Sequence, residues 1–311
     1  MKKIYNSIEE MVGNTPLLRL NRWEYKHSLS ASLLVKCEFY NPLFSVKDRA
    51  ALKMIEKAEK ENKITEKTVF VEATSGNTGI ALAAFCSSKG YKLVITMPEN
   101  MSQERIVMMR HLGAEVILTP KEDGMKGAIV KANLLKEKNP NVIIFEQFEN
   151  CANVDAHRFS TSMEIMDATQ GEVDVLVAGV GTAGTLIGTA ATLKSYNPDL
   201  YVVAVEPKSS AVLNGDKAGI HDIAGIGAGF IPPLYDKNLV NEVFDVEDVK
   251  AWETAGAIAK TEGLPIGISA GAAVWAATEI AKRKEMEGKN IVIILPDSIN
   301  NYISRLTTHQ D

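Results

Sequence analysis

One lysine in this sequence stands where the first turn of a helix is expected. In the segment NPLFSVKDRAALKMIEKAEKENK, residues 41–63, apolar residues recur at helical spacing, and Ser45 with Asp48 three residues later has the pattern of a capping box. The pattern predicts a helix that starts near Val46, so Lys47 falls in a turn whose free amides disfavour an ammonium. Two interpretations stay open: a side chain that reaches water, or an amine kept neutral enough to be a nucleophile.

A first glycine-containing loop follows a predicted strand and opens a helix, in VEATSGNTGIALAAF. Glycines let a ligand approach the backbone closely, while hydroxyls, an amide and free helix N–H groups form a cradle for an anion. A carboxylate or a phosphate would suit this loop, although a turn with a helix cap needs no ligand. The loop comprises Thr74, Ser75, Gly76, Asn77, Thr78 and Gly79.

A second glycine loop, VLVAGVGTAGTLIGTAATL, has the dinucleotide-type spacing of Gly179, Gly181 and Gly184. The next strand ends at Glu206, about where an NAD site would place its ribose-binding acid. The same loop also fits a single phosphate group, because Gly181–Thr185 combines small residues with hydroxyl donors at a helix start. The spacing leaves both ligands open.

A third loop, PIGISAGAAVWAATEI, contains G-x-S-x-G around Ser269, with Asp297 and His309 following in the order of a hydrolase triad. Gly263 and Pro265 interrupt the strand that a nucleophile elbow requires, and His309 lies close to the end of the sequence, so a hydrolase is disfavoured. The remaining histidines, at 27, 111, 157 and 221, show no metal-ligand spacing.

The composition is that of an ordinary globular protein: 311 residues, 46% hydrophobic and 23% charged. A net charge of −5 and a pI near 5.7 give no basic field for nucleic acid or anionic lipid. The odd number of cysteines, at 37, 86 and 151, indicates reduced thiols. Without an apolar leader or a run of 18 apolar residues, we expect a cytoplasmic protein with no membrane or nucleic-acid partner.

Short β-rich runs alternate with helical patterns along the chain, which predicts an α/β fold with parallel strands buried on both faces. Two regions are irregular. Residues 147–162 contain Asn and Asp without a regular pattern and could be a domain crossing, and Gly, Pro, Asn and Asp cluster in residues 213–238, which form a long candidate functional loop. The predicted strands are residues 68–73, 92–98, 114–120, 142–148, 173–180, 201–207 and 290–295.

Seven motifs in this order resemble the cysteine synthase and cystathionine β-synthase family of pyridoxal-phosphate enzymes, over essentially the whole chain. They are NPLFSVKDR, TSGNTGIALA, EQFEN, GVGTAGT, GIGAGFIP, GISAGAA and LPDSINNYIS. The resemblance implies fold type II, the tryptophan synthase β-like fold, with two three-layer αβα domains and mostly parallel sheets. It implies a larger cofactor-binding domain, residues 1–38 and 152–311, and a smaller mobile domain, residues 39–151.

The resemblance also implies the cofactor residues. Lys47 would form the internal Schiff base with pyridoxal 5′-phosphate and Asn77 would contact the ring hydroxyl. Ser269 would bond the pyridine nitrogen, and a neutral serine there favours loss of a β-substituent over transamination. The phosphate would be held by Gly181, Thr182, Ala183, Gly184 and Thr185.

For the substrate, the resemblance implies that Gly225 faces the site and that one group binds the α-carboxylate of an amino acid. That group is Thr74, Ser75, Gly76, Thr78 and Gln147. The expected reaction is a β-replacement in which O-acetyl-L-serine loses acetate, leaves an α-aminoacrylate and accepts sulfide to give L-cysteine. Freed Lys47 would take the α-proton, and carboxylate binding would draw the smaller domain inward and exclude water.

Three departures from cysteine synthases keep other readings open. Ala183 replaces a glycine, which phosphate binding should survive unless the position needs positive φ. Ala270 replaces a serine, and residues 157–169 lack a common Gly-Pro pair. Homocysteine as acceptor, as in cystathionine β-synthase, or a cysteine lyase that releases sulfide, would use the same first half-reaction. A non-catalytic cofactor-holding protein is a further alternative, which the presence of Lys47 disfavours. The family also implies a homodimer.

Overall fold

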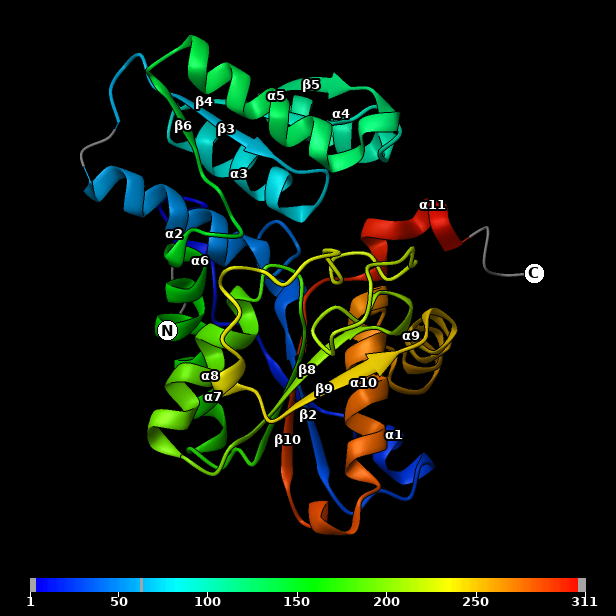
Figure 1. The fold of residues 1–311 in the computed structure, drawn as a ribbon. Coiled ribbons are helices and arrows are strands. Elements are labelled where there is room, and N and C mark those ends of the chain that lie inside the picture. The colour runs from blue at the N-terminus through cyan, green and yellow to red at the C-terminus, as the bar shows by residue number, and fades with distance from the viewer. Residues whose placement is uncertain (1–3, 62–63, 307–311) are drawn as a thin grey trace. The chain divides into compact units, whose positions relative to one another are not determined.

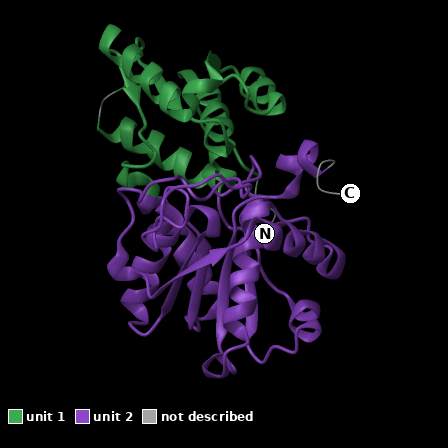
Figure 2. Cartoon of the chain, turned by 45° about the vertical axis from the view of Figure 1, so that its right-hand side comes forward, with its two compact units in different colours: residues 1–12, 47–153 green, residues 13–46, 154–311 purple. Residues whose placement is uncertain are grey.

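The computed structural model describes residues 4–61 and 64–306. Two compact units are coloured separately in Figure 2: unit 1 comprises residues 1–12 and 47–153, and unit 2 comprises residues 13–46 and 154–311. Residues 4–12 thus group with unit 1. One boundary lies at 46/47, where the sequence suggested 38/39, and the other lies at 153/154, where it suggested 151/152.

Unit 1 is built on a four-stranded parallel sheet. Its strand order is β5 (Glu115–Thr119), β4 (Lys92–Pro98), β3 (Val69–Ala73) and β6 (Val142–Ile144). Right-handed crossovers place α3 and α4 on one face of the sheet and α5 on the other (Figure 1). The helices are α2 (Lys47–Lys60), α3 (Asn77–Ser88), α4 (Gln103–His111), α5 (Gly124–Lys138) and α6 (Cys151–Ala156), of which α6 crosses the second boundary.

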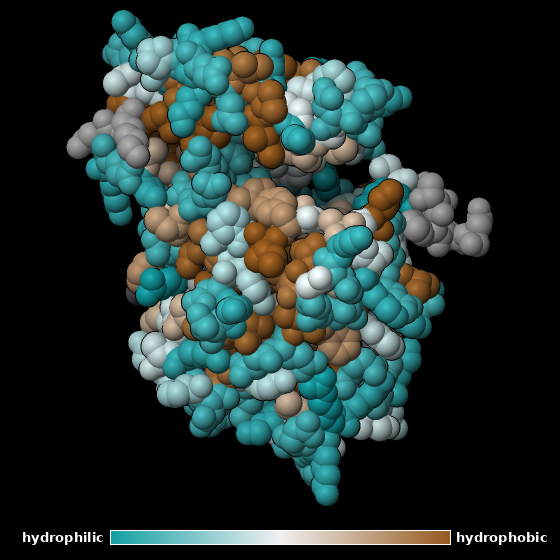
Figure 3. Space-filling view, viewed as in Figure 1, coloured by the Kyte–Doolittle hydropathy of each residue, from teal (hydrophilic) through white to brown (hydrophobic). Residues whose placement is uncertain are grey.

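The core of unit 1 is apolar on both faces of its sheet. Phe70 of β3 is fully buried and stacks on Phe145 with ring centroids 4.6 Å apart. Small residues at Ala128 and Ala132 bring α5 close to the strands. Exposed apolar side chains on the outer side of α5 appear as a brown area within a largely polar surface in Figure 3; they are Met125, Ile129, Val130 and Leu134.

Unit 2 contains a six-stranded sheet in which the edge strand β1 is antiparallel and the other strands are parallel. In spatial order the strands are β1 (Leu17–Arg19), β2 (Ser32–Cys37), β10 (Asn290–Leu295), β7 (Val175–Gly179), β8 (Tyr201–Pro207) and β9 (Glu242–Val246). The helices are α1 (Asn21–Lys26), α7 (Ser162–Thr169), α8 (Gly184–Tyr196), α9 (Asp248–Glu262), α10 (Ile268–Ala281) and α11 (Ile303–Leu306).

Alternate residues of the unit 2 strands face two separate apolar layers. Val175 and Val177 pack into a cluster with residues of α1, α9 and α10, whereas Leu176 and Ala178 pack with α7 and α8. This period of two, with both sides buried, makes unit 2 a three-layer αβα sandwich. Short turns complete the fold: a π-helical turn at His157–Thr161 and 3₁₀ turns at Glu9–Met11, Glu38–Tyr40, Lys121–Asp123, Lys208–Ser210, Lys237–Leu239, Lys284–Met286 and Ile299–Tyr302.

Every predicted strand is present, and α2 begins at Lys47 as predicted. β4, β8 and β10 match the predicted residues. The strand predicted for residues 142–148 ends at Ile144, because Glu146 has a left-handed φ of 56° that a strand cannot continue. The sequence analysis did not predict β1, β2 or β9. Within the described residues, no helix has the length and apolar character needed to cross a membrane.

Candidate active site

Lys47 is the first residue of α2 and its side chain is partly buried. The next two side chains, Asp48 and Arg49, are 0% and 3% exposed. The lysine therefore lies in the first helical turn, as predicted, among buried charged neighbours. This placement differs from that of a surface lysine whose side chain extends freely into solvent.

The loop that follows β3 has the form expected of an anion cradle. Its backbone continues the sheet at Thr74, whose N–H donates to the carbonyl of Thr96 at 3.1 Å, and α3 then begins at Asn77. Arg105 of α4 donates from Nη1 to the carbonyl of Ser75 at 3.2 Å, so a guanidinium lies beside the loop. A helix start, hydroxyls and a nearby positive charge together favour a carboxylate ligand.

Gln147 joins this loop from a distant part of the sequence. Its side-chain oxygen accepts a hydrogen bond from Thr78 Oγ1 at 2.8 Å, and both residues are buried. Because the oxygen of Gln147 accepts from Thr78, its amide nitrogen is the group left to donate elsewhere. Within unit 1 the structure thus brings together the residues predicted to bind a carboxylate: Thr74, Ser75, Gly76, Thr78 and Gln147.

Glu72, which the sequence analysis missed, holds the backbone of Gln147 in place. Its carboxylate accepts the N–H of Glu146 at 3.0 Å and the N–H of Gln147 at 3.4 Å. Burial raises the pKa of Glu72 to about 7, although the two backbone hydrogen bonds act in the opposite direction. Asn153 supports the same segment by donating to the carbonyl of Gln147 at 2.8 Å. The signal available in the sequence was an acid inside a buried strand, VFVEA.

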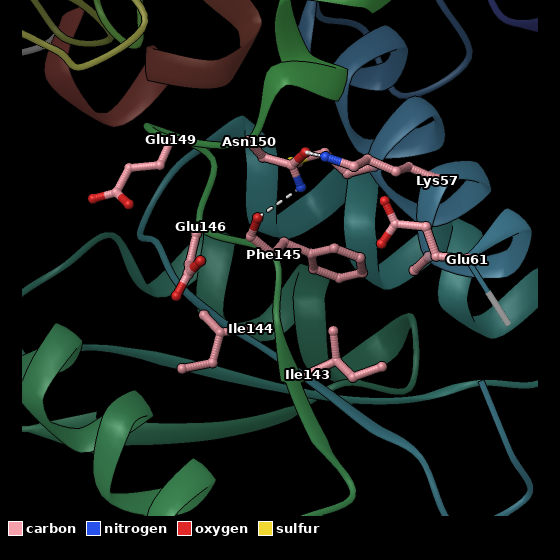
Figure 4. A pocket seen from close by; sticks show the side chains of 10 residues that line it. Lys57, Glu61, Ile143, Ile144, Phe145, Glu146, Glu149 and Asn150 are labelled. Atoms are coloured by element: carbon pink, nitrogen blue, oxygen red, sulfur yellow. Dashed lines mark hydrogen bonds between the residues drawn. The ribbon is translucent and has the colours of Figure 1, made fainter. Parts of the chain in front are cut away.

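Residues 143–146, which precede Gln147, and Glu149 and Asn150, which follow it, line a cavity of about 280 Å³ together with residues of α2 (Figure 4). There Lys57 of α2 donates to Asn150 Oδ1 at 3.3 Å, and Asn150 Nδ2 donates to the carbonyl of Phe145 at 2.8 Å. These bonds attach the segment to α2. The backbone of Gln147 is therefore held directly by Glu72 and Asn153, and the segment that carries it is attached to α2 through Asn150.

The second glycine loop connects β7 to α8 in unit 2. Ala183 adopts φ 70°, ψ −13°, a left-handed conformation that costs an alanine about 1–2 kcal/mol and a glycine almost nothing. The position thus has the positive φ that the sequence analysis named as the exception. The alanine adopts this φ at that cost and keeps its peptide N–H as a donor. The strained residue leads directly into the free amides of α8, beside Thr182 and Thr185.

Gly181 is required by the close approach of another loop. A Cβ at this position would lie 2.4 Å from the carbonyl oxygen of Gly225, and Gly225 itself has a φ of 94°. A Cβ on Gly225 would lie 3.8 Å from Ser269 Oγ, so this second loop also adjoins the start of α10. Within unit 2 the structure thus brings together the predicted phosphate loop, Gly225 and Ser269.

His157 is a second residue that the sequence analysis did not place at the site. Its Nε2 lies 3.2 Å from Thr185 Oγ1, and its Nδ1 lies 2.8 Å from Thr161 Oγ1. The ring is 1% exposed. A contact across 28 residues, between a π-helical turn and the first turn of α8, leaves no periodic signal in the sequence.

The NAD and hydrolase readings do not fit the structure. Glu206 is buried, which raises its pKa, and its two oxygens accept the N–H groups of Leu213 and Asn214 at 2.9 and 3.0 Å. This carboxylate therefore accepts hydrogen bonds from backbone N–H groups instead of facing a ribose.

Ser269 is the second residue of α10, and the segment before it forms only an isolated bridge at Ile266 where a nucleophile elbow requires a strand. His309 lies outside the described residues.

Residues 181–185 of unit 2 and Lys47 of unit 1 each have the chemistry to bind one functional group of a cofactor. Glycine backbone, two threonine hydroxyls and the N-terminus of α8 fit a phosphate group, and the lack of a Cβ at Gly181 lets the loop pack against the carbonyl oxygen of Gly225. Lys47 is an amine suited to an aldehyde. Among the described residues, no cluster of three or more His, Cys, Asp or Glu could hold a metal ion.

Comparisons with known proteins agree with this chemistry. A family model described as pyridoxal-phosphate dependent enzyme matches residues 8–297. A cysteine synthase from Staphylococcus aureus (strain N315) is 45% identical over 305 residues, which cover 97% of both chains. The crystal structure of cysteine synthase (OASS) from Entamoeba histolytica matches with a TM-score of 0.95 and 43% identity, covering 97% of this chain and 90% of that one.

A third similar structure is a hydrogen sulfide-producing enzyme from Fusobacterium nucleatum, with a TM-score of 0.93 and 42% identity, covering 97% of this chain and 99% of that one. These matches extend over nearly the full length of the sequence and include both glycine loops. The chain therefore belongs to the pyridoxal-phosphate-dependent enzymes of fold type II, with two αβα domains.

Proposed function

We propose that this chain catalyses a cysteine synthase-type β-replacement, in which O-acetyl-L-serine and sulfide give L-cysteine and acetate. The observation that carries the proposal is 45% identity to a cysteine synthase over 97% of both chains. The two loops needed for such a reaction support it, since one suits a carboxylate and the other a phosphate.

In this proposal Lys47 Nζ would hold pyridoxal 5′-phosphate through the cofactor's aldehyde, and Asn77 would contact its ring hydroxyl. When bound, the cofactor supplies an electron-withdrawing ring that lets the α-proton and the β-substituent of an amino acid leave. Its phosphate is held by backbone N–H groups and hydroxyls of Gly181, Thr182, Ala183, Gly184 and Thr185. The N-terminus of α8 adds its dipole to these contacts.

Ser269 acts as the neutral partner of the ring nitrogen. A hydroxyl forms a hydrogen bond there without the fixed negative charge of an aspartate, so it does not hold the nitrogen protonated. The ring then withdraws electrons less strongly. Loss of a β-leaving group is favoured over transamination as a result.

The substrate is bound by its α-carboxylate at Thr74, Ser75, Gly76, Thr78 and Gln147, and Gly225 faces the reacting atoms. Lys47 Nζ would take the α-proton as acetate departs and return it to the α-carbon as sulfide adds to the β-carbon. We further propose that residues 39–151 form a mobile domain that moves on carboxylate binding and excludes water.

A second candidate reaction is release of sulfide from L-cysteine, or use of homocysteine as the acceptor as in cystathionine β-synthase. The similarity to a hydrogen sulfide-producing enzyme at 42% identity favours the first of these. Ala270, where many cysteine synthases have serine, is a sequence difference that bears on the acceptor. Both reactions would use the same lysine and the same two loops.

The test is to supply O-acetylserine, serine and cysteine separately to the purified enzyme and measure acetate and sulfide, with sulfide or homocysteine as acceptor. We expect acetate release from O-acetylserine and cysteine formation with sulfide. If cysteine alone reacts and sulfide is released, the synthase assignment is wrong and the lyase assignment holds. A colourless folded protein that never takes up the cofactor would exclude both.

We also propose a cytoplasmic homodimer that has no nucleic-acid or membrane partner. The net charge of −5 argues against polyanion binding, and two of the three cysteines, Cys37 and Cys86, are buried free thiols that suit a reducing compartment. Light scattering coupled to gel filtration measures the mass directly. A mass near 34 kDa would contradict the dimer.

A further inference from the structure

His157 is a buried imidazole with a hydroxyl beside each ring nitrogen. Thr161 Oγ1 lies 2.8 Å from Nδ1 and Thr185 Oγ1 lies 3.2 Å from Nε2. The ring is 1% exposed and Thr161 is fully buried. Thr185 belongs to the loop that starts α8, so the histidine reaches the candidate phosphate site through this hydroxyl.

The local backbone explains how the ring comes so close to α8. Residues His157–Thr161 form a π-helical turn between α6 and α7, a distortion that frequently occurs at functional sites. On the facing helix, Gly188 has no side chain. A Cβ there would lie 2.3 Å from the carbonyl oxygen of Val154 and 2.9 Å from Cβ of His157. The glycine therefore allows α8 to pack directly on the segment that carries the histidine.

Two positions of the ring proton satisfy both hydroxyls, and they differ in which hydrogen Thr185 has left to donate. A neutral imidazole has one donor and one acceptor, and it avoids burying a net charge. If Thr161 donates to Nδ1, then Nε2 carries the hydrogen and donates to Thr185 Oγ1. The Thr185 hydroxyl hydrogen is then not used by the histidine. It is free to point at an anion in the loop.

We propose that His157 is a positioning residue for the cofactor phosphate: its Nε2–H fixes the Thr185 hydroxyl as a donor to that group. The opposite tautomer would take the hydroxyl hydrogen of Thr185 and present only oxygen lone pairs to a phosphate dianion. In the proposed arrangement Thr161 Oγ1 donates to Nδ1, 2.8 Å away, and so holds the ring in the required tautomer. The inference rests on the proposed phosphate role of residues 181–185.

The test compares pyridoxal 5′-phosphate with pyridoxal, which lacks the phosphate group. Dissociation constants for pyridoxal 5′-phosphate and for pyridoxal are measured on the full chain after cofactor removal, for wild type and His157→Phe. Loss of one hydrogen bond to a charged group predicts about tenfold weaker binding of pyridoxal phosphate and unchanged binding of pyridoxal. A purely structural defect would weaken both ligands alike.

Two further variants sharpen the measurement. His157→Gln keeps an N–H donor near the Nε2 position, so it should recover part of the lost affinity. Thr189→Val is the matched control: it lies one turn further along α8, is fully buried, and its hydroxyl has no hydrogen-bond partner in the described structure. It should leave the ratio of the two dissociation constants unchanged.

Nuclear magnetic resonance on the wild-type holoenzyme tests the tautomer even if a variant does not fold. The ¹⁵N shifts should show His157 protonated at Nε2 and bare at Nδ1, and the ³¹P resonance should move in His157→Phe. The opposite tautomer, or an unchanged ratio in a folded His157→Phe, would overturn the inference. A wild type that binds pyridoxal and pyridoxal phosphate equally would instead refute the phosphate loop itself.

Discussion

Glu72 accepts a hydrogen bond from the backbone N–H of Gln147, 75 residues further along the chain. The bond links the end of β3, where the carboxylate loop begins, to the segment that supplies the loop's side-chain amide. Burial of the same carboxyl raises its pKa to about 7. Stability and substrate positioning therefore depend on one titrating group.

The first prediction concerns the pH dependence of stability. The folded chain binds the Glu72 proton more tightly than the unfolded chain, so the free energy of unfolding should fall by about 3 kcal/mol as the pH rises from about 4.5 to 7. Glu72→Gln should lose this contribution and show a flatter profile, measured by urea unfolding from pH 5 to 8. Glu149→Gln, an exposed acid of the same segment, is the control. Parallel profiles for wild type and Glu72→Gln would contradict the prediction.

The second prediction concerns the left-handed residue of the phosphate loop. Ala183→Gly relieves strain but loses a buried methyl and adds chain entropy to the unfolded state, so the free energy of unfolding should change by less than about 1 kcal/mol. Ala183→Val should cost about 3 kcal/mol, because a β-branched residue is poorly tolerated at φ 70°. Thermal unfolding of the two variants measures the difference. Equal stability of both would mean that the position is not left-handed.

The third prediction concerns the contact of Gly181 with Gly225. Gly181→Ala places a methyl 2.4 Å from a backbone oxygen, which cannot move as a side chain can, so cofactor affinity should fall at least about tenfold. Gly256→Ala is the matched control, since a Cβ there meets nothing within 4 Å, and this change in α9 should add about 0.5–1 kcal/mol of stability. Cofactor titration and urea unfolding are the measurements. Wild-type affinity in Gly181→Ala would show that the loops separate at little cost.

The fourth prediction concerns the lysine at the start of α2. Lys47→Ala should lower turnover by about 10³-fold or more and abolish the covalent adduct trapped by borohydride, because both the amine nucleophile and the general base are removed. Lys53→Ala, in the same helix and paired with Glu56, should keep both. Mass spectrometry of the reduced protein locates the adduct. An adduct on any other lysine would refute the assignment.

The fold could be predicted largely because its strands are buried on both faces and read as short apolar runs. β4, β8 and β10 match the predicted residues for this reason. β1 has three residues, and β9 is an edge strand whose apolar side chains are interrupted by Glu242 and Asp245, so neither forms a continuous apolar run. The end of β6 depends on the left-handed Glu146, a conformation that residue type alone does not reveal.

The site could be predicted where residue types are unusual and local in sequence. A loop rich in glycine and threonine at a helix start can be recognised from its sequence as a candidate anion site, as the loop with Gly181 and Thr182 was. Glu72 and His157 could not be found in this way, because each acts through a partner 28 or more residues away. Their roles arise from burial and from two specific contacts, that of the Glu72 carboxylate with the Gln147 N–H and that of His157 Nε2 with Thr185 Oγ1.

The close approach of Gly181 to Gly225 also limits how this protein can be recombined with its relatives. A chimaera that takes residues 179–185 from a homologue receives a loop that packs, in the homologue, against that protein's own 225–227 segment. In the hybrid the loop would instead have to fit the carbonyl oxygen of Gly225 in this chain. The two segments should be exchanged as a pair, although Gly181 and Gly225 are 44 positions apart along the chain.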